Sequence, residues 1–246
     1  FEAMESRLGV RLNRNKGQDT LESLQAASRG EIQAALLMGG NLYAASPDTQ
    51  WAEKALDNIG FKLYLTTTLN LGHIHGVDEG ETIILPVTAR DEEPEATTQE
   101  SMFNYVRLSD GGIDRLDNVR AETHILADLG SEILGSDDVD FQRFKSHKTL
   151  REAIAEIVPG MQALADIDVA KREFHISGRL KHTPEFALPS GRAIFNTRLL
   201  PVRIKPPFVL STVRSEGQFN NIIYEENDSY RDVDSRWSVL ISPDDI

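Results

Sequence analysis

The sequence predicts an α/β fold, with an open, mainly parallel sheet and flanking helices, followed by the start of a β-barrel domain. In the first part of the chain, strand-length apolar runs alternate with amphipathic stretches of helical spacing; the runs lie at residues 32–38, 61–66 and 82–85. From about residue 192, short β-rich pieces separated by Pro, Gly, Asn and Asp replace the helical patterns. We therefore expect two domains, residues 1–191 and residues 192–246.

Charge and composition exclude several classes of function. The chain has 26 Lys and Arg against 39 Asp and Glu, and its net charge of −13 argues against non-specific binding of nucleic acid or of an anionic membrane. No segment reaches the roughly 18 consecutive apolar residues of a membrane span. The first residues lack a signal-peptide pattern, so we expect a cytoplasmic location and leave the periplasm open. The absence of cysteine excludes disulfides, cysteine-ligated metals, iron–sulfur clusters and a thiolate nucleophile within this chain.

Two helices are predicted before the first strand. Apolar spacing over residues 1–8 predicts a short helix. Asp19 and Glu22 then have capping-box spacing, in which the first side chain accepts N–H groups of the first turn and the second reaches back. Leu21 and Leu24 are expected on the buried face of this second helix.

The predicted strand at 32–38 and the helix after it follow from local patterns. The run is almost continuously apolar, as expected of a strand covered on both faces. Ser46 and Pro47 predict the N-cap and first turn of the next helix, whose apolar stripe covers residues 51–59. Gly60 is expected to end this helix before the second strand begins.

The rest of the first domain is predicted to mix loops, a hairpin and helices. Residues 91–100 predict a polar, acidic loop, and a hairpin that turns at residues 109–112 follows. Apolar residues between 121 and 133 indicate an amphipathic helix. Residues 149–152 predict the capped start of another helix, which ends before Pro159.

Two loops at the carboxyl ends of predicted strands are candidate ligand contacts. Gly39, Gly40 and Asn41 follow the first strand, and the polar segment 66–76 follows the second. In open parallel sheets, ligands bind beyond the carboxyl ends of the strands. The glycine pair lacks both the P-loop and the dinucleotide fingerprint, so a tight turn explains it as well as a ligand does. Asn41 could hydrogen-bond a base or ribose, or cap its own turn.

Two histidines in the second loop raise the question of a metal. His73 and His75 stand two residues apart, which places both imidazoles on one side of an extended segment. Zinc needs a third ligand, and no other residue has recognisable metal spacing, so we assign no metal ligands. We assign no catalytic residues either, because no Ser-His-Asp arrangement can be assembled and no carboxylate pair can be selected among 39 acidic residues. A small metal-dependent hydrolase stays an alternative, although Asn70 and His73 fit hydrogen-bonding loop residues better.

Another polar loop lies between two β-like runs at residues 213–221. Arg214, Ser215, Gln218 and Asn220 surround a glycine there. Arginine holds phosphate through a bidentate fork, and glycine lets the backbone approach a ligand closely. A β-turn with a surface arginine explains the same pattern.

Several stretches of the chain together carry a family resemblance. They are MGGNLYAASPDT, TTTLNLGHIHG, TIILPVTARDEE, TVRSEGQFNNIIYEENDSYRDV and LISPDDI. In this order they resemble the molybdopterin oxidoreductases, and especially the formate-dehydrogenase-like large subunits. The resemblance implies a four-domain subunit that carries molybdenum or tungsten on two molybdopterin guanine dinucleotides. It assigns residues 1–191 to the later part of a dinucleotide-binding α/β domain and residues 192–246 to the beginning of the C-terminal barrel.

The resemblance also implies contacts to the dinucleotide from both domains. In the α/β domain, residues of two neighbouring loops would line its phosphate or ribose: Gly39, Gly40, Asn41, Thr67, Thr68, Asn70 and His73. In the barrel, residues of one loop would contact its pterin or pyrophosphate side: Arg214, Ser215, Gln218, Phe219, Asn220 and Asn221. Arg90 also matches a family position near the cofactor.

The chain departs from the family pattern in two respects. The cysteines of the iron–sulfur cluster and the Cys or selenocysteine ligand of the metal belong to upstream domains, whereas this chain has no cysteine. The barrel also ends at Ile246, before several expected strands. We therefore expect a partial large subunit, an excised piece or a split chain, that is inactive alone. Its expected partners are the remainder of the subunit and electron-transfer subunits, and the alternative from another class is a scaffold subunit without the metal.

Overall fold

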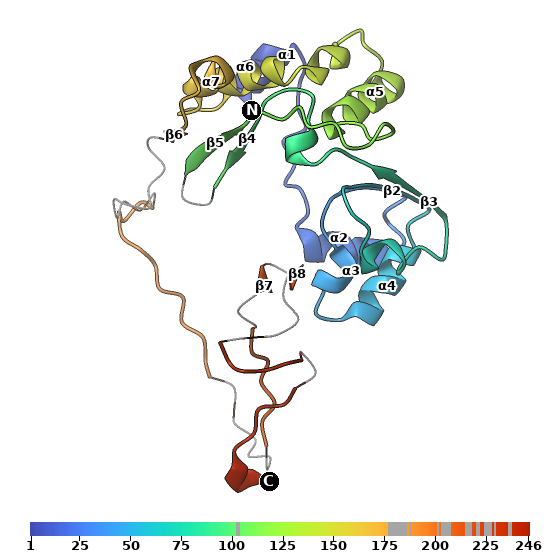
Figure 1. Cartoon of the computed structure of the whole chain (residues 1–246), viewed down its shortest axis with the longest axis vertical. Helices are drawn as coiled ribbons and strands as arrows, with labels where there is room; N and C mark the ends of the chain where they lie inside the picture. The colour runs from blue at the N-terminus through green and yellow to red at the C-terminus, as the bar shows by residue number, and fades with distance from the viewer. Residues whose placement is uncertain are drawn as a thin grey trace. The chain divides into compact units, whose positions relative to one another are not determined.

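The computed structural model describes most of the chain, which divides into two units. The described residues are 1–101, 104–176, 186, 188–200, 202, 208–214, 218–219, 222–223, 228, 230–235 and 238–246. The two compact units are Phe1–Ala187 and Leu188–Ile246, coloured from blue to red along the chain in Figure 1. No helix within these residues is long and apolar enough to cross a membrane.

A three-stranded parallel sheet forms part of the first unit. Its strands are β1 (Ala34–Met38), β2 (Phe61–Thr66) and β3 (Glu81–Pro86), in the order β1-β2-β3. The helix α4 (Thr49–Asp57) connects the first two strands, beside the sheet in Figure 1. The predicted α/β architecture with a parallel sheet and flanking helices is therefore confirmed for this part of the chain.

The strand β1 is less covered than its sequence predicts. Leu36 and Met38 are each 47% exposed, although an apolar run of this kind predicts burial on both faces. Leu36 and Met38 share a face of the sheet with Leu63 and Leu65, but the cluster that α5 (Glu122–Leu134) forms on this face contains no residue of β1. The prediction of a strand was correct, but the prediction that both of its faces are buried was wrong.

Side chains of β2 alternate between two packed faces of the sheet. On one face, Leu63 lies in a buried cluster with Ile125 of α5. On the other face, α2 (Thr20–Ser28) and α4 form a second cluster, in which Leu56 is almost fully buried. Helices therefore cover both faces of the central strand.

Lys62 of β2 is fully buried on the face that α4 covers. Its ammonium group donates to the carbonyl oxygens of Leu56 at 3.2 Å, Ile59 at 3.0 Å and Glu79 at 2.9 Å. Burial lowers the pKa of Lys62, and the nearby Asp57 opposes this effect. An ammonium group has three donors, so three carbonyls satisfy it completely. Lys62 thus ties the end of α4 and the turn before β3 to the central strand.

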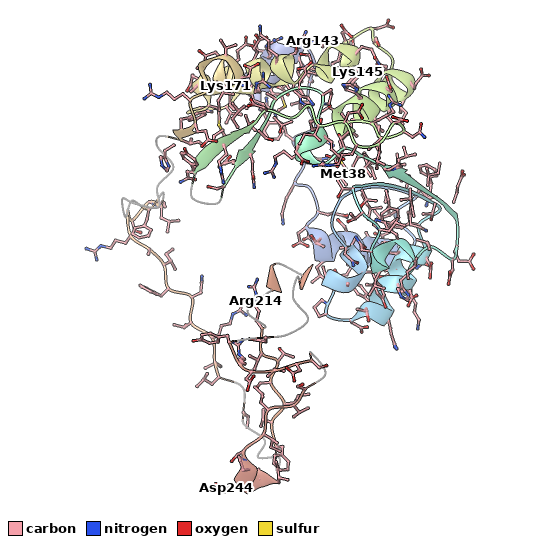
Figure 2. The ribbon with its side chains drawn as sticks, in the orientation of Figure 1. Met38, Arg143, Lys145, Lys171, Arg214 and Asp244 are labelled. Carbon is pink, nitrogen blue, oxygen red and sulfur yellow. The ribbon has the colours of Figure 1, made fainter. Side chains whose placement is uncertain are left out.

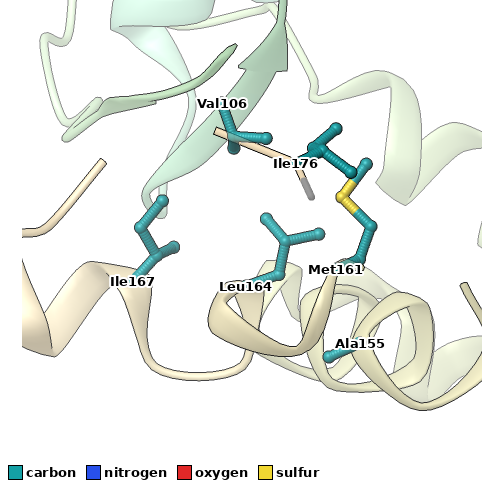
Figure 3. Packing of buried hydrophobic residues seen from close by; sticks show 6 residues of the cluster. All are labelled: Val106, Ala155, Met161, Leu164, Ile167 and Ile176. Atoms are coloured by element: carbon teal, nitrogen blue, oxygen red, sulfur yellow. The ribbon is translucent and has the colours of Figure 1, made fainter. Parts of the chain in front are cut away.

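The first unit also contains a separate, antiparallel sheet. Its strands are β4 (Thr97–Glu100), β5 (Tyr105–Ser109) and β6 (Phe174–His175), in that order. The core beneath it consists of buried apolar residues from β5, α6 and the segments that follow, which Figure 3 shows from close by: Val106, Ala155, Met161, Leu164, Ile167 and Ile176. This sheet is small and was not predicted as such.

Two predictions near this sheet were wrong. The acidic segment 91–100 contains β4, and the hairpin turns between β4 and β5 rather than at residues 109–112. Gly111 and Gly112 do have positive φ values of 71° and 84°, as turn glycines often have. The N–H of Gly112, however, donates to the carbonyl of Glu93, so this turn returns the chain to an irregular segment instead of a second strand.

Helix starts were predicted at the wrong cap residue in two places. Asp48 is the N-cap of α4, whereas Ser46, the predicted cap, ends α3 (Leu42–Ala45). Ser146 is the N-cap of α6 (His147–Ile157), ahead of the predicted capping box. Each stretch contains several residues able to cap a helix, and only the path of the backbone selects one of them.

The first two helices largely follow the prediction. A short α1 (Glu2–Leu8) is present, and the capping box of Asp19 and Glu22 is confirmed at the start of α2. Leu21 is 57% exposed, however, so its predicted place on the buried face was wrong. The other short helices of the first unit are η1 (Leu71–His73), η2 (Arg90–Glu92), η3 (Phe141–Lys145), η4 (Gln162–Leu164) and α7 (Ile167–Ala170).

The second unit contains little regular structure among its described residues. β7 (Gln218–Phe219) pairs antiparallel with β8 (Ile222–Ile223), and η5 (Pro243–Asp245) lies near the end of the chain. The described parts of the predicted β-rich pieces at 193–202 and 237–242 contain no strand. No barrel is formed by the residues that the structure describes, and the barrel stays a prediction.

A buried histidine–glutamate pair joins α6 to the segment before β4. His147 Nε2 lies 3.2 Å from Glu93 Oε2 and 3.1 Å from Thr123 Oγ1. Glu93 raises the pKa of His147, although burial of the imidazole opposes this. Burial alone would raise the pKa of the Glu93 carboxyl, but hydrogen bonds from His147 and Thr88 outweigh it and lower that pKa.

We expect Lys62→Met to lower the free energy of unfolding of the chain by roughly 1–3 kcal/mol, because it leaves buried carbonyls without a donor. Chemical denaturation measures this change. Lys54→Met is the control, because Lys54 lies exposed on α4, and it should change stability by less than about 0.5 kcal/mol. A Lys62→Met variant as stable as the wild type would show that the buried charge costs as much as its hydrogen bonds contribute.

The His147 pair predicts a pH dependence of stability. A raised pKa in the folded state stabilises fully below the ordinary pKa of about 6.5, and this contribution is lost as the pH rises through the folded value. The stability difference between the wild type and His147→Gln should therefore be larger at pH 6 than at pH 9. Chemical denaturation at both pH values measures this stability difference. In a Glu93→Gln background, most of its change between pH 6 and pH 9 should disappear. A difference independent of pH would contradict the assignment.

Candidate functional site

Three segments leave the parallel strands at the same edge of the sheet. Gly39 follows β1, Thr67 follows β2 and Val87 follows β3. The carboxyl ends of parallel strands in an open α/β sheet are the usual place for ligands. The candidate functional site is therefore built from the loops at this edge.

The glycine loop after β1 is open and conformationally demanding. Gly39 and Gly40 have φ values of 62° and 73°, and both are exposed. No described atom lies within 4 Å of the position that a Cβ would take at either glycine. The N–H of Gly39 donates to the carbonyl of Leu65 at 2.8 Å, which fixes the loop to β2. The left-handed backbone explains the glycines, and the open space leaves their backbone accessible.

Asn41 caps the helix that follows the glycines. Its Oδ1 accepts the N–H of Ala44 at 3.0 Å, at the start of α3. The capping role that the sequence left open is therefore present, which leaves the ligand role as a prediction. A Cβ on Gly72 would come within 2.7 Å of Asn41 Oδ1, so the two loops pack closely at this point.

Asn70 connects the second loop to the first. Its Nδ2 donates to the carbonyl of Gly40, and its Oδ1 accepts the N–H of Gly72, both at 2.9 Å. Thr67 and Thr68 lie exposed beside it, on the same loop. The structure thus brings the two predicted loops into direct contact at the carboxyl edge, where the chain presents backbone and hydroxyl groups to solvent.

The two histidines of the second loop face different partners. His73 is buried, its Nδ1 accepts the N–H of Asn70 at 2.9 Å, and burial lowers its pKa. His75 Nδ1 lies 2.9 Å from Glu53 Oε1, and its ring stacks on Tyr43. Within the described ranges, no group of three or more His, Cys, Asp or Glu could hold a metal ion. The hydrolase hypothesis therefore has no ligand set there.

The site is short of positive charge. Residues 38–48 and 66–76 contain no lysine or arginine. Arg90, the predicted contact after β3, is exposed and donates through Nη1 to Gln99 Oε1. These loops can therefore meet a phosphate through N–H and hydroxyl groups, and a ribose or base through the same groups and carbonyls.

The second unit holds the remaining predicted contact residues. Arg214, which is labelled in Figure 2, is exposed, and Gln218 and Phe219 form β7. Ser215, Asn220 and Asn221 lie outside the described residues. A joint site formed by these residues and the loops of the first unit stays a prediction.

A larger cavity of about 440 Å³ lies elsewhere in the first unit, between η2 and the start of α5. Its charged lining residues pair mainly with other side chains: Arg115 with Asp91, and Arg120 with Asp128. Volume alone does not indicate a ligand, so the loops at the sheet edge remain the candidate site.

The chain is similar to one portion of several larger proteins, some of which are named oxidoreductases. No family model matches it. The chain is 31% identical, over 99% of its length, to uncharacterized oxidoreductase Rv2900c of Mycobacterium tuberculosis, and 27% identical, over 88%, to protein YdeP of Escherichia coli. A stretch of 32% of the chain is 41% identical to part of an NADH-quinone oxidoreductase of Streptomyces coelicolor. The chain spans 33% of the first relative and 30% of the second, so it is homologous to one portion of such proteins.

We expect Asn70→Ala to separate the two loops, because it removes the donor to Gly40 that joins them and an acceptor that holds Gly72 within the second loop. The free energy of unfolding should fall by roughly 1–2 kcal/mol, and amide exchange at Gly40 and Gly72 should become faster. Asn58→Ala is the control, because Asn58 Nδ2 also donates to a distant carbonyl, that of Ser28, away from the site. Equal exchange at the loop in both variants would contradict the role of Asn70.

Proposed function

We propose that this chain is the cofactor-binding portion of a molybdenum or tungsten oxidoreductase of formate-dehydrogenase type, which carries molybdopterin guanine dinucleotide. The observation that carries the proposal is the exposed, left-handed Gly39–Gly40 backbone, held by Asn70 at the carboxyl edge of a parallel sheet. The family resemblance of the same loops supports it. The similarity to proteins named oxidoreductases supports the broader class.

The chemistry of the two loops fits the nucleotide part of such a cofactor. The glycines leave room for a ligand to approach the backbone, and the exposed Thr67 and Thr68 offer hydroxyl groups. Without lysine or arginine, the loops would hold a ribose or guanine edge through hydrogen bonds and a phosphate through N–H groups. Such contacts orient a ligand without a strong electrostatic attraction.

Positive charge for the pyrophosphate would come from the second unit. The net charge of −13 disfavours a polyanionic ligand unless basic groups lie next to it. In the proposed arrangement, Arg214 supplies that charge, together with Ser215, Gln218, Phe219, Asn220 and Asn221 at the start of a barrel. A guanidinium suits this role because it binds phosphate oxygens through two parallel hydrogen bonds.

The reacting end of the cofactor would lie outside this chain. When bound, such a metal centre would supply two-electron redox chemistry, and the residues of this chain would contribute binding and orientation. We assign no catalytic residue to this chain, and we propose that the remainder of the large subunit provides the metal ligand and any iron–sulfur cluster. Electron-transfer subunits are proposed as further partners.

Substitution of the two exposed glycines tests the proposed site. Gly39→Ala and Gly40→Ala in the full-length protein should each reduce bound molybdenum or tungsten and pterin, because a Cβ would project into the open space of the loop. Metal analysis and pterin fluorescence measure the content. Gly30→Ala is a matched control, because Gly30 has a φ of 72° and the same open surroundings but lies away from the loops.

The outcomes of this experiment separate the two candidate functions. A cofactor content that falls in the loop variants and stays unchanged in Gly30→Ala supports the proposal. Equal content in all three variants would contradict the assignment of the loop. A folded full-length protein that contains neither metal nor pterin would favour a scaffold subunit.

The proposed arginine contact has its own test. Arg214→Ala in the full-length protein should lower the content of bound cofactor, because it removes a phosphate-binding group. Arg198→Ala is the control, because it removes the same charge from another exposed position of the second unit. Unchanged metal content and activity in Arg214→Ala would count against the contact.

A further inference from the structure

The face of β2 that α4 covers carries three polar residues in alternate positions. These are Lys62, Tyr64 and Thr66, and all three are buried. Lys62 is satisfied by three carbonyls, and Thr66 Oγ1 donates to the carbonyl of Thr68 at 2.7 Å. The Tyr64 hydroxyl is buried and has no hydrogen-bond partner among the described residues.

Tyr64 lies at the junction of the two candidate loops. Its ring packs edge-on against His73, with the ring centres 5.1 Å apart. It also lines a small cavity of about 10 Å³, together with residues of both loops: Gly39, Gly40, Asn41, Asn70, Gly72 and His73. That volume corresponds to about one water molecule.

The chemistry of the cavity lining suits a water molecule. A phenolic hydroxyl both donates and accepts hydrogen bonds. His73 Nδ1 accepts the N–H of Asn70, so a neutral His73 ring carries its proton on Nε2 and offers a second donor. Buried waters occur in small polar cavities, where each makes about three hydrogen bonds to groups that would otherwise be unsatisfied.

The alternative is that the buried Tyr64 hydroxyl has no hydrogen-bond partner at all, not even a water molecule. Burying a hydroxyl without a partner costs free energy, and phenylalanine would fill the same space without that cost. The two explanations therefore predict opposite changes in the stability of the loops when Tyr64 is replaced by phenylalanine. A satisfied hydroxyl stabilises its surroundings, whereas an orphaned hydroxyl destabilises them.

We propose that one ordered water occupies this cavity, held by the Tyr64 hydroxyl, and that Tyr64 is a positioning residue for the two loops. The water would hydrogen-bond the loop groups that line the cavity and hold Gly39 and Gly40 against the segment of Asn70 and His73. Tyr64 thus acts through the water and makes no contact with a ligand. Its effect on cofactor retention rests on the proposed function, but the water site itself does not.

Tyr64→Phe tests the proposal in the full-length protein. Amide exchange at Gly39, Gly40 and Gly72 should become roughly tenfold faster, because the water loses its anchor. Tyr105→Phe is the matched control, because it removes a hydroxyl that bonds Glu173 in the other sheet, at 2.9 Å. A high-resolution crystal structure should show the water in the wild type and its loss in Tyr64→Phe.

Each outcome decides the proposal. Unchanged or slower exchange in Tyr64→Phe, or a cavity that is empty in the wild type, would overturn it, because the hydroxyl would then be orphaned. Equally fast loop exchange in Tyr105→Phe would overturn it too, since the effect would be global. Faster loop exchange and loss of the water in a protein that binds no molybdopterin would support the water site and contradict only the proposed function.

Discussion

The arrangement of the first unit depends on the burial of the central strand β2. Helices cover both of its faces, and one face carries a buried charge at Lys62. Such a charge is tolerated because three carbonyls replace the water that it loses on folding. The carbonyls belong to Leu56 in the last turn of α4, to Ile59 just after that helix and to Glu79 before β3. The same interaction therefore sets the positions of the helix and of the strands beside it.

This rigid centre positions the loops at the carboxyl edge of the sheet. The N–H of Gly39 donates to Leu65 of β2, and Asn70, four residues after β2, donates to Gly40. Backbone that must adopt a left-handed conformation is thereby fixed by hydrogen bonds from its neighbour strand and loop. A ligand that binds there would find these groups already oriented, which reduces the entropy cost of binding.

The charge of the chain and the length of its relatives indicate which part of the proposed enzyme contributes which contact to the cofactor. The acidic first unit contributes neutral hydrogen-bonding groups, and the proposal assigns the cationic contact to Arg214 of the second unit. The chain spans about a third of its relatives named as oxidoreductases. In the proposed enzyme, this portion would hold the nucleotide of the cofactor, and another portion would provide the ligand of the metal at which the redox chemistry takes place.

The sequence by itself determined the parallel α/β core and the site's two loops, because apolar period, a capping box and paired glycines are local signals. It did not determine the exposure of β1 or which residue caps α6, since the place of a strand in a sheet and the path of the chain depend on distant segments. The partners of Lys62 and the pairing of His147 with Glu93 were likewise decided by the tertiary structure. Polar side chains acquire such roles only when folding removes them from water and offers carbonyls or carboxylates in exchange.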